Sequence, residues 1–322
     1  NEAAGTAFQD SLFGYVSLYG RSVWRLSDAQ AAVIAAERML QRARKADQDA
    51  AREVKALIGL GDLFYDIGVP RESVRVDSLA LHIAERNQRT LPADVMSEAN
   101  LALGTAYLDI GDLSRALPLL QAALVAAGRL KPPPSILLGR IHMTLGGCLR
   151  RMGRTSDAER SYKAGLDAIA QDTSTAAMSR RASLLGNTGI LVQSTGDMHR
   201  CKTYYHRSLS TLNTLIERFA NDPVRRDGAM MNRSRIYLNM ASVYGNGGDV
   251  QRARELLDLC LRDRLSVLPA DHPQVIAVND GYAELEAYAG DPDRAEQLFR
   301  AQLSSARATY GESSAQYASV GY

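Results

Sequence analysis

Apolar and small residues recur at helical spacing on both sides of a glycine in the stretch from Asn100 to Ala123. They are Leu103, Gly104 and Tyr107 before the glycine, and Ala116, Leu120 and Ala123 after it. The glycine between them, Gly111, can adopt the left-handed conformation that ends many helices. The pattern predicts two helices joined by a tight turn and packed through their apolar faces. Because one hairpin cannot bury its apolar face alone, further copies at a fixed period are expected.

The turn glycine recurs along most of the chain. It stands at Gly68, Gly111, Gly153, Gly196, Gly248 and Gly290, in steps of 43, 42, 43, 52 and 42 residues. Seven positions before it lies a small residue, which is Gly61, Gly104, Gly146, Gly189, Ala241 or Ala283. Nine positions after it lies a large apolar residue in every copy except the first, which has Asp77. These columns predict six consecutive hairpins over residues 49–310, with the helices of each hairpin touching at the small residue.

The central stretch resembles the tetratricopeptide repeat. Leu103-Gly104, Tyr107, Ala116 and Leu120 match the pattern of that repeat, with Asn100 at its usual Trp position. The resemblance implies an all-α fold, a right-handed superhelical solenoid of stacked antiparallel helical hairpins. The basic unit has about 34 residues, so the longer steps resemble the repeats of kinesin light chains and of bacterial arrays joined to signalling NTPases and caspase-like proteases. The segment from His272 to Leu303 is similar to the kinesin-light-chain pattern His-Pro-x-Val-Ala, Leu-Asn-Asn-Leu-Ala, Gly-Asp, Glu-Ala-Glu.

Some parts of the chain depart from the regular repeat. Residues 1–47 predict a divergent N-terminal helical hairpin, and residues 311–322 predict the start of a further or capping helix. Three prolines follow Lys131 and break any helix, so a stiff spacer is expected there. The 52-residue step contains a stretch from Ala220 to Met231 that predicts a loop between two lengthened helices, and such insertions often serve binding.

Composition limits the classes of partner. The chain has 322 residues, of which 46% are hydrophobic and 23% charged, and its net charge is only +2. A globular protein is expected, with no overall attraction to nucleic acid and no membrane span. Cys148, Cys201 and Cys260 form no metal-binding or disulfide pattern and fall in columns that favour small residues. They predict buried packing residues and a cytoplasmic or other reducing intracellular compartment, an organelle included.

The sequence offers little support for catalysis. His199, Cys201 and His206 suggest a metal, but three ligands are few and the repeat phase places Cys201 in the interior. Glycine-rich phosphate loops and nucleophile-elbow motifs are absent from the sequence. A non-catalytic protein with no cofactor and no bound metal is therefore expected.

The first helices of such hairpins line a concave groove, where polar residues left over from packing form ladders. Acidic ladder residues occur early in the chain and basic ones in its middle. The predicted partner-binding residues are Asp62, Asp66, Asp109, Arg140, Arg150, Arg151, Asn187, Gln193, Arg235 and Asn239. The two asparagines occupy a column where repeats of the resembled family often carry an Asn that holds a ligand's backbone. The ladders predict a protein or peptide partner with an acidic segment.

The resemblance implies a protein-interaction scaffold or adaptor that binds a peptide or partner helix in its groove. Two alternatives stay open. One is a regulatory sensor module of a larger signalling protein with an NTPase or caspase-like protease domain. The other is a structural subunit or assembly factor of a large organellar or ciliary complex.

Overall fold

The computed structural model describes residues 34, 49–66, 70–270 and 272–310, which form helices and no strand. The chain divides into a unit 1 that ends at Arg180 and a unit 2 that begins at Arg181. The described helices of unit 1 include α3 (Ala50–Asp66), α4 (Pro70–Arg86), α5 (Ala93–Asp109), α6 (Leu113–Gly128), α7 (Ser135–Arg151) and α8 (Thr155–Ala168). Helix α9 (Thr175–Ser194) begins in unit 1 and continues into unit 2. Unit 2 then has α10 (Met198–Arg218), α11 (Pro223–Asn246), α12 (Val250–Leu265), α13 (Pro273–Ile276), α14 (Val278–Ala289) and α15 (Pro292–Tyr310).

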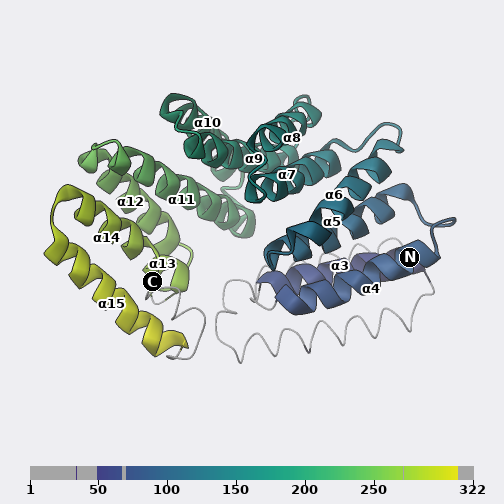
Figure 1. Ribbon diagram of the computed structural model, residues 1–322, viewed down its shortest axis with the longest axis horizontal. Coiled ribbons are helices and arrows are strands. Elements are labelled where there is room, and N and C mark those ends of the chain that lie inside the picture. The colour runs from purple at the N-terminus through teal and green to yellow at the C-terminus, as the bar shows by residue number, and fades with distance from the viewer. Residues whose placement is uncertain (1–33, 35–48, 67–69, 271, 311–322) are drawn as a thin grey trace. The chain divides into compact units, whose positions relative to one another are not determined.

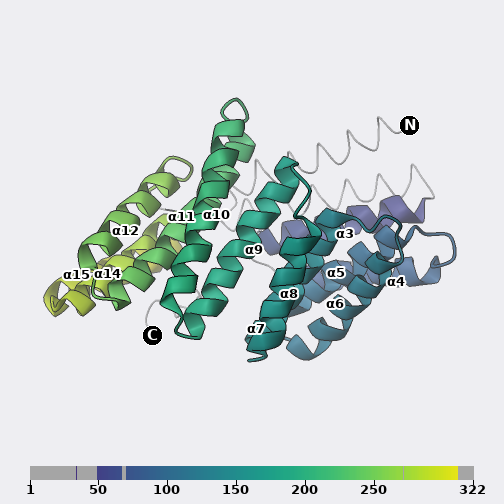
Figure 2. The same ribbon diagram turned by 90° about the horizontal axis from the view of Figure 1, so that it is seen from above.

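Consecutive helices pack as antiparallel hairpins within each unit. In unit 1 the pairs are α3 with α4, α5 with α6 and α7 with α8, and each pair also contacts the next (Figure 1). In unit 2 the pairs α11 with α12 and α14 with α15 are arranged in the same way (Figure 2). The all-helical hairpin fold predicted from the sequence is confirmed. The hairpin predicted for residues 1–47, apart from Ile34, lies outside the described residues, as do Gly68 and the segment 311–322.

The turn inside each hairpin follows from a glycine and the residue after it. Gly111, Gly153, Gly196, Gly248 and Gly290 all have positive φ, between 74° and 85°. At the first of these turns the amide of Asp112 donates to the carbonyl of Tyr107 at 2.9 Å, which closes α5. The Asp112 side chain then accepts from the amide of Arg115 and so caps α6. A Gly-Asp pair therefore ends α5 and begins α6, whereas Arg154 follows Gly153 and gives α8 no side-chain cap.

The two helices of a hairpin touch where the sequence has its small residue. A Cβ atom added at Gly104 would lie 2.9 Å from Cδ2 of Leu120 and 3.3 Å from Cβ of Leu119. Gly146 and Gly189 face the rings of Tyr162 and Tyr205 in the same way. Leu120 and both tyrosines are fully buried, so these pairs form the centre of their hairpins.

The substitution Gly104→Leu is expected to lower the stability of unit 1 by about 1–3 kcal/mol, because the added side chain overpacks the contact with Leu120. Thermal unfolding measures this loss. Gly128→Leu is the matched control, since no atom lies within 4 Å of a Cβ added at Gly128. An unchanged midpoint for Gly104→Leu would mean that this contact is not closely packed in solution.

The structure corrects one prediction about the connections. The stretch from Ala220 to Met231 is mostly helical rather than a loop, because α11 already begins at Pro223. Asp222 caps that helix by accepting from the amide of Arg225, and a proline at the first helical position favours helix formation. The lengthened helices themselves are present. The prolines after Lys131 do lie between helices, since α7 begins at Ser135.

Candidate functional site

The first helices of unit 1 bring two predicted ladder charges and one further carboxylate into electrostatic contact. They are Asp62 on α3, Glu98 on α5 and Arg140 on α7. Desolvation by the surrounding protein raises the pKa of Asp62 although its side chain still reaches solvent. The charge of Arg140 lowers that pKa and the charge of Glu98 raises it. An acidic and a basic member of the predicted ladders therefore partly neutralise each other.

A second pair of predicted residues lies at the ends of α5 and α7. The pKa of Asp109 is raised to about 6, because desolvation raises it by more than the nearby charge of Arg151 lowers it. The guanidinium of Arg151 also donates to the carbonyl of Leu108 in the last turn of α5. A cation at a helix C-terminus interacts favourably with the helix dipole and with its unpaired carbonyls. Arg151 thus joins two neighbouring hairpins and is already engaged within the protein.

Arg150 and Gln193 have a role that the repeat phase alone did not reveal. The hydroxyl of the buried Tyr205 donates to Oε1 of Gln193 at 3.0 Å. Burial raises the pKa of Tyr162, and the nearby charge of Arg150 lowers it. The two tyrosines occupy the same repeat position, and so do their two partners. In both hairpins the predicted groove residue therefore interacts with a buried tyrosine, through a hydrogen bond at Gln193 and through its charge at Arg150.

The remaining predicted residues lie on α9 and α11 in unit 2, with one exception. Asn187 and Asn239 are half-buried at equivalent positions of these two helices. Arg235 is exposed, and its Nη2 atom lies 3.4 Å from Oδ1 of Asn232. Asp66 is the last residue of α3, and its side chain lies outside the described atoms. Arg140 in unit 1, and Asn187, Arg235 and Asn239 in unit 2, therefore stay predicted partner-binding residues, half-buried or exposed in the structure.

Arg180 is a charged residue of the same region that the ladders did not include. It belongs to the first turns of α9, and its Nε atom is buried without a hydrogen-bond partner. The equivalent residues of the two preceding hairpins are Val95 and Leu137, which are buried and apolar. The same position holds Arg52, Asn232 and Gln274 in the other hairpins, so the repeat column alone could not have singled out Arg180.

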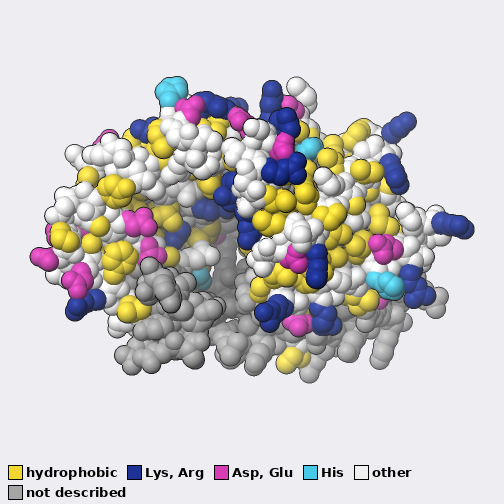
Figure 3. All heavy atoms as spheres, in the orientation of Figure 1, with side chains coloured by type: hydrophobic (Ala, Val, Ile, Leu, Met, Phe, Trp, Pro, Cys, Tyr) yellow, Lys and Arg dark blue, Asp and Glu magenta, His cyan; other side chains and the backbone are white. Residues whose placement is uncertain are grey.

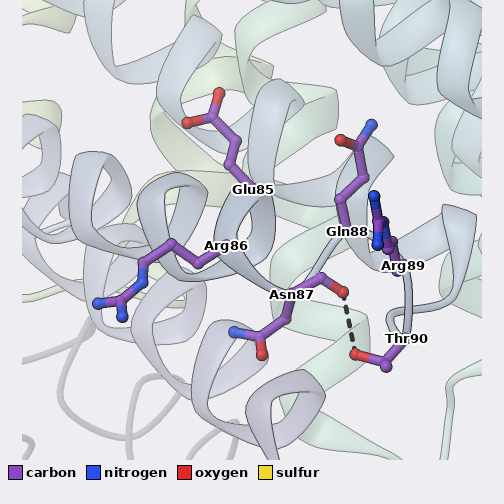
Figure 4. Close-up of a pocket in the computed structure, with 6 residues that line it drawn as sticks. All are labelled: Glu85, Arg86, Asn87, Gln88, Arg89 and Thr90. Carbon is purple, nitrogen blue, oxygen red and sulfur yellow. Dashed lines mark hydrogen bonds between the residues drawn. The ribbon is translucent and has the colours of Figure 1, made fainter.

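No large field of one sign marks a binding surface on the face drawn in Figure 3, where basic and acidic side chains are interspersed over both units. A hollow lined by residues 85–90 lies where α4 runs into the following turn (Figure 4). Its side chains radiate outward, and the hydroxyl of Thr90 donates to the carbonyl of Asn87 at 3.0 Å. This hollow lacks the converging polar groups of a small-molecule site.

Chemical groups for metal binding are not gathered in the described part of the chain. No group of three or more His, Cys, Asp or Glu side chains is arranged there to hold a metal ion. Cys148, Cys201 and Cys260 are buried and free, as predicted, and burial raises the pKa of each thiol. None of the described helices has the length and the apolar run that crossing a bilayer requires.

Comparisons with known proteins agree with this architecture. The sequence profile described as Tetratricopeptide repeat matches residues 234–274, which lie in α11 to α13. A search of curated protein sequences gave no match. Among solved structures, BtubC (BKLC) from P. vanneervenii is 20% identical with a TM-score of 0.60, covering 75% of this chain and 92% of its own.

Two further solved structures resemble this chain in fold. A Rap protein complexed with competence and sporulation factor is 16% identical with a TM-score of 0.61, covering 91% of this chain and 74% of its own. The apo form of the quorum sensor NprR from B. thuringiensis is 12% identical with a TM-score of 0.56, covering 97% and 79%. The chain is therefore a helical-hairpin repeat protein of the tetratricopeptide type.

Proposed function

We propose that this protein is a non-catalytic interaction scaffold whose first helices bind an acidic segment of a protein or peptide partner. The observation that carries the proposal is the state of Arg140. Its guanidinium is half-buried beside other charged groups of the first helices, and no ion pair joins it to a carboxylate of the described residues. A carboxylate from a partner would supply the charge-assisted hydrogen bonds that Arg140 lacks.

Residues of unit 2 support the same function. Asn187 and Asn239 each offer a donor and an acceptor for an extended backbone. Arg235 adds an exposed positive charge on α11. The likeness in fold to a Rap protein crystallised with competence and sporulation factor adds a precedent for ligand binding on this architecture. The sensor-module and assembly-subunit alternatives stay predictions.

A displayed peptide library selected on the immobilised protein tests this function. Peptides rich in Asp and Glu are expected to be enriched, and their affinity should fall as salt rises, because the contacts are partly exposed. Arg140→Gln in unit 1 and Arg235→Gln in unit 2 are each expected to weaken the peptides that bind to the same unit about tenfold, the size of one charge-assisted contact. Binding is measured by fluorescence anisotropy, with circular dichroism to verify the helices.

The control is Arg129→Gln, which removes the same charge from the exposed connection before α7. Arg150 and Arg151 are poor choices for this test, since their loss would disturb Tyr162 and the end of α5. If the library yields no acidic peptide, or if the variants bind as the wild type does, this function is wrong.

A further inference from the structure

Helix α6, the second helix of its hairpin, presents an uncharged outer face. No charged residue occurs between Arg115 and Arg129, and the exposed positions between them follow one another at the spacing of a single helix face. These positions are Pro118, Gln121, Ala122, Val125 and Gly128. Val125 is 60% exposed, the largest exposed fraction of any valine, leucine or isoleucine in the described part of the chain. Figure 3 shows hydrophobic side chains gathered where Figure 1 places α6.

The same face is polar in the other hairpins. Pro118 and Val125 stand seven and fourteen residues after the turn glycine, and a step of seven residues is about two helical turns. The equivalent pairs of exposed residues are Arg75 and His82 on α4, Arg160 and Asp167 on α8, Thr203 and Ser210 on α10, and Glu255 and Arg262 on α12. Contact with water explains these four polar faces, but it does not explain the apolar face of α6. An exposed apolar patch framed by polar residues is typical of an interface with another molecule.

One end of this face carries unpaired positive charge. Arg129 and Lys131 lie in the exposed connection between α6 and α7, and no ion pair joins either side chain to a carboxylate of the described residues. At the other end Arg115 is already engaged, because it forms an ion pair with Asp112 and lies over the ring of Tyr107. A partner that covers the apolar face is therefore expected to bring acidic groups to Arg129 and Lys131.

A second copy of this chain does not match these charges. If a two-fold axis ran along α6, the positive end of each copy would face the positive end of the other. If the axis crossed α6, Arg115 and its partner Asp112 would lie at the positive end of the other copy and offer it no free carboxylate. A separate partner can supply the missing negative charge in either direction.

The shape of the face favours a protein over a lipid surface. Ala122 and Gly128 have little or no side chain, so another helix can approach α6 closely while Val125 packs between its residues. A helix that binds to a bilayer surface usually carries bulky leucine or aromatic side chains on its apolar face. The exposed positions of α6 include no such side chain.

We propose that the outer face of α6 binds an amphipathic helix of a partner protein, with acidic residues at the end of that helix next to Arg129 and Lys131. The stretch from Pro118 to Gly128 covers about three turns, so a partner helix of that length is enough. This surface belongs to a second helix, whereas the proposed function concerns the first helices. The inference therefore goes beyond that function.

Fluorescence anisotropy of a fluorescein-labelled, hydrocarbon-stapled helical peptide tests this surface. The peptide has the length of α6, 16 residues. It carries leucine and alanine along one face, glutamine elsewhere and a pair of glutamates in its first turn, which an antiparallel helix brings to Arg129 and Lys131. Val125→Asp is expected to weaken its binding at least about tenfold, because the new carboxylate would be buried under the peptide.

The fold is expected to tolerate this substitution, since α8 has Asp167 at the equivalent position. Circular dichroism verifies the helices. The matched control is Ser210→Asp, which adds the same charge at the equivalent position of α10 and should leave binding as in the wild type.

An exchange of charges tests the acidic end of the partner. A second peptide with lysines in place of the glutamates should bind the wild type at least about tenfold more weakly. The double variant Arg129→Glu/Lys131→Glu should reverse this preference. A preference that stays the same in the double variant would show that the partner need not be acidic and would overturn that part of the proposal.

Other results would overturn the surface itself. They are failure of both peptides to bind the wild type, equal binding by Val125→Asp and the wild type, and an equal loss of binding in the Ser210→Asp control. Binding to vesicles of phosphatidylcholine and phosphatidylserine that Val125→Asp abolishes would identify a lipid surface instead. Dimers in analytical ultracentrifugation that the same variant abolishes would identify a second copy of the chain.

The outcome for this surface is distinguishable from the outcome for the proposed function. Peptides bound by the first helices of unit 1 should respond to Arg140→Gln and should not respond to Val125→Asp or Arg129→Gln. The stapled helix should show the reverse. Failure of one set of responses therefore leaves the other intact.

Discussion

Replacing Arg233 by methionine is expected to destabilise unit 2 by about 3–5 kcal/mol, because the buried carboxylate of Asp263 would lose its partner. Arg233 lies on α11 and Asp263 on α12, and two hydrogen bonds of 2.8 Å join them in a bidentate pair. The two side chains are only 20% and 5% exposed. Water therefore cannot replace the lost guanidinium, and the charge would stay uncompensated inside the hairpin.

Two further contacts fix the geometry of this pair. The Nη1 atom of Arg233 donates to Oδ1 of Asn213 on α10 at 2.8 Å. The guanidinium also lies 5.8 Å from the ring centroid of Tyr237, which is within the range of a cation–π contact. Three consecutive helices of unit 2 therefore meet at Arg233. Its removal is expected to affect their packing as well as the charge balance.

Urea unfolding of two variants and a control measures this effect. The double variant Arg233→Met/Asp263→Leu should recover most of the lost stability, since an apolar pair can replace a buried ion pair at little cost. The control is Arg225→Met on the same helix, whose ion pair with Asp222 is 67% and 41% exposed and should contribute less than about 1 kcal/mol. A loss for Arg233→Met no larger than that of the control would show that water reaches Asp263.

The repeat positions fixed by backbone geometry were predictable from the sequence. Only glycine adopts positive φ without strain, so the recurrence of Gly111 and its equivalents located the turns. Small residues such as Gly104 located the helix contacts for a similar reason, since a Cβ atom added there would come within 2.9 Å of Leu120. These constraints are local or involve one neighbouring helix, and a single sequence is enough to detect them.

The destinations of long polar side chains were not predictable in this way. Their positions in the repeat place Arg151 and Gln193 on the first helices of their hairpins. These positions do not tell whether the polar ends of the two side chains contact a ligand or another part of the protein. Arg151 reaches the end of α5, and Gln193 reaches the hydroxyl of Tyr205. The predicted separation of acidic and basic ladders also overlooked that adjacent hairpins bring opposite charges together. The sequence therefore placed these side chains on the first helices, but it did not tell which of them are engaged within the protein.

Replacing Asp77 by leucine is expected to raise the free energy of unfolding of unit 1 by at least about 2–3 kcal/mol at pH 7.5, since it removes an unsatisfied buried acid and adds apolar burial. Asp77 occupies the position of Leu120 in the next hairpin, and only 4% of it is exposed. Its carboxyl group lies against Gly61, and the Oδ1 atom has no hydrogen-bond partner. The next hairpin shows that a leucine can pack against a glycine at this position.

The same residue makes the stability of unit 1 depend on pH. Desolvation, and secondly the negative charge of Asp62, raise the pKa of Asp77 to about 8. In the unfolded chain the pKa of an aspartate is about 3.9. Between these values the folded protein holds a proton that the unfolded chain has released. The stabilising contribution of the neutral acid is therefore complete below about pH 4 and is lost as the pH rises to about 8, with a slope of at most about 1.4 kcal/mol per pH unit.

Urea unfolding at several pH values between 5.5 and 8.5 separates Asp77 from the other titrating groups. Asp77→Asn is the matched control, because it keeps the size and polarity of the side chain and removes its titration. Asp62 and Asp109 titrate in the wild type and in both variants, so the difference between their stability curves reports mainly on Asp77. The advantage of Asp77→Leu over the wild type should grow with pH, whereas the difference between the two variants should stay nearly constant. Parallel curves for all three proteins would show that Asp77 keeps its charge and its water in the folded state, and a leucine at this position would then add only its apolar burial.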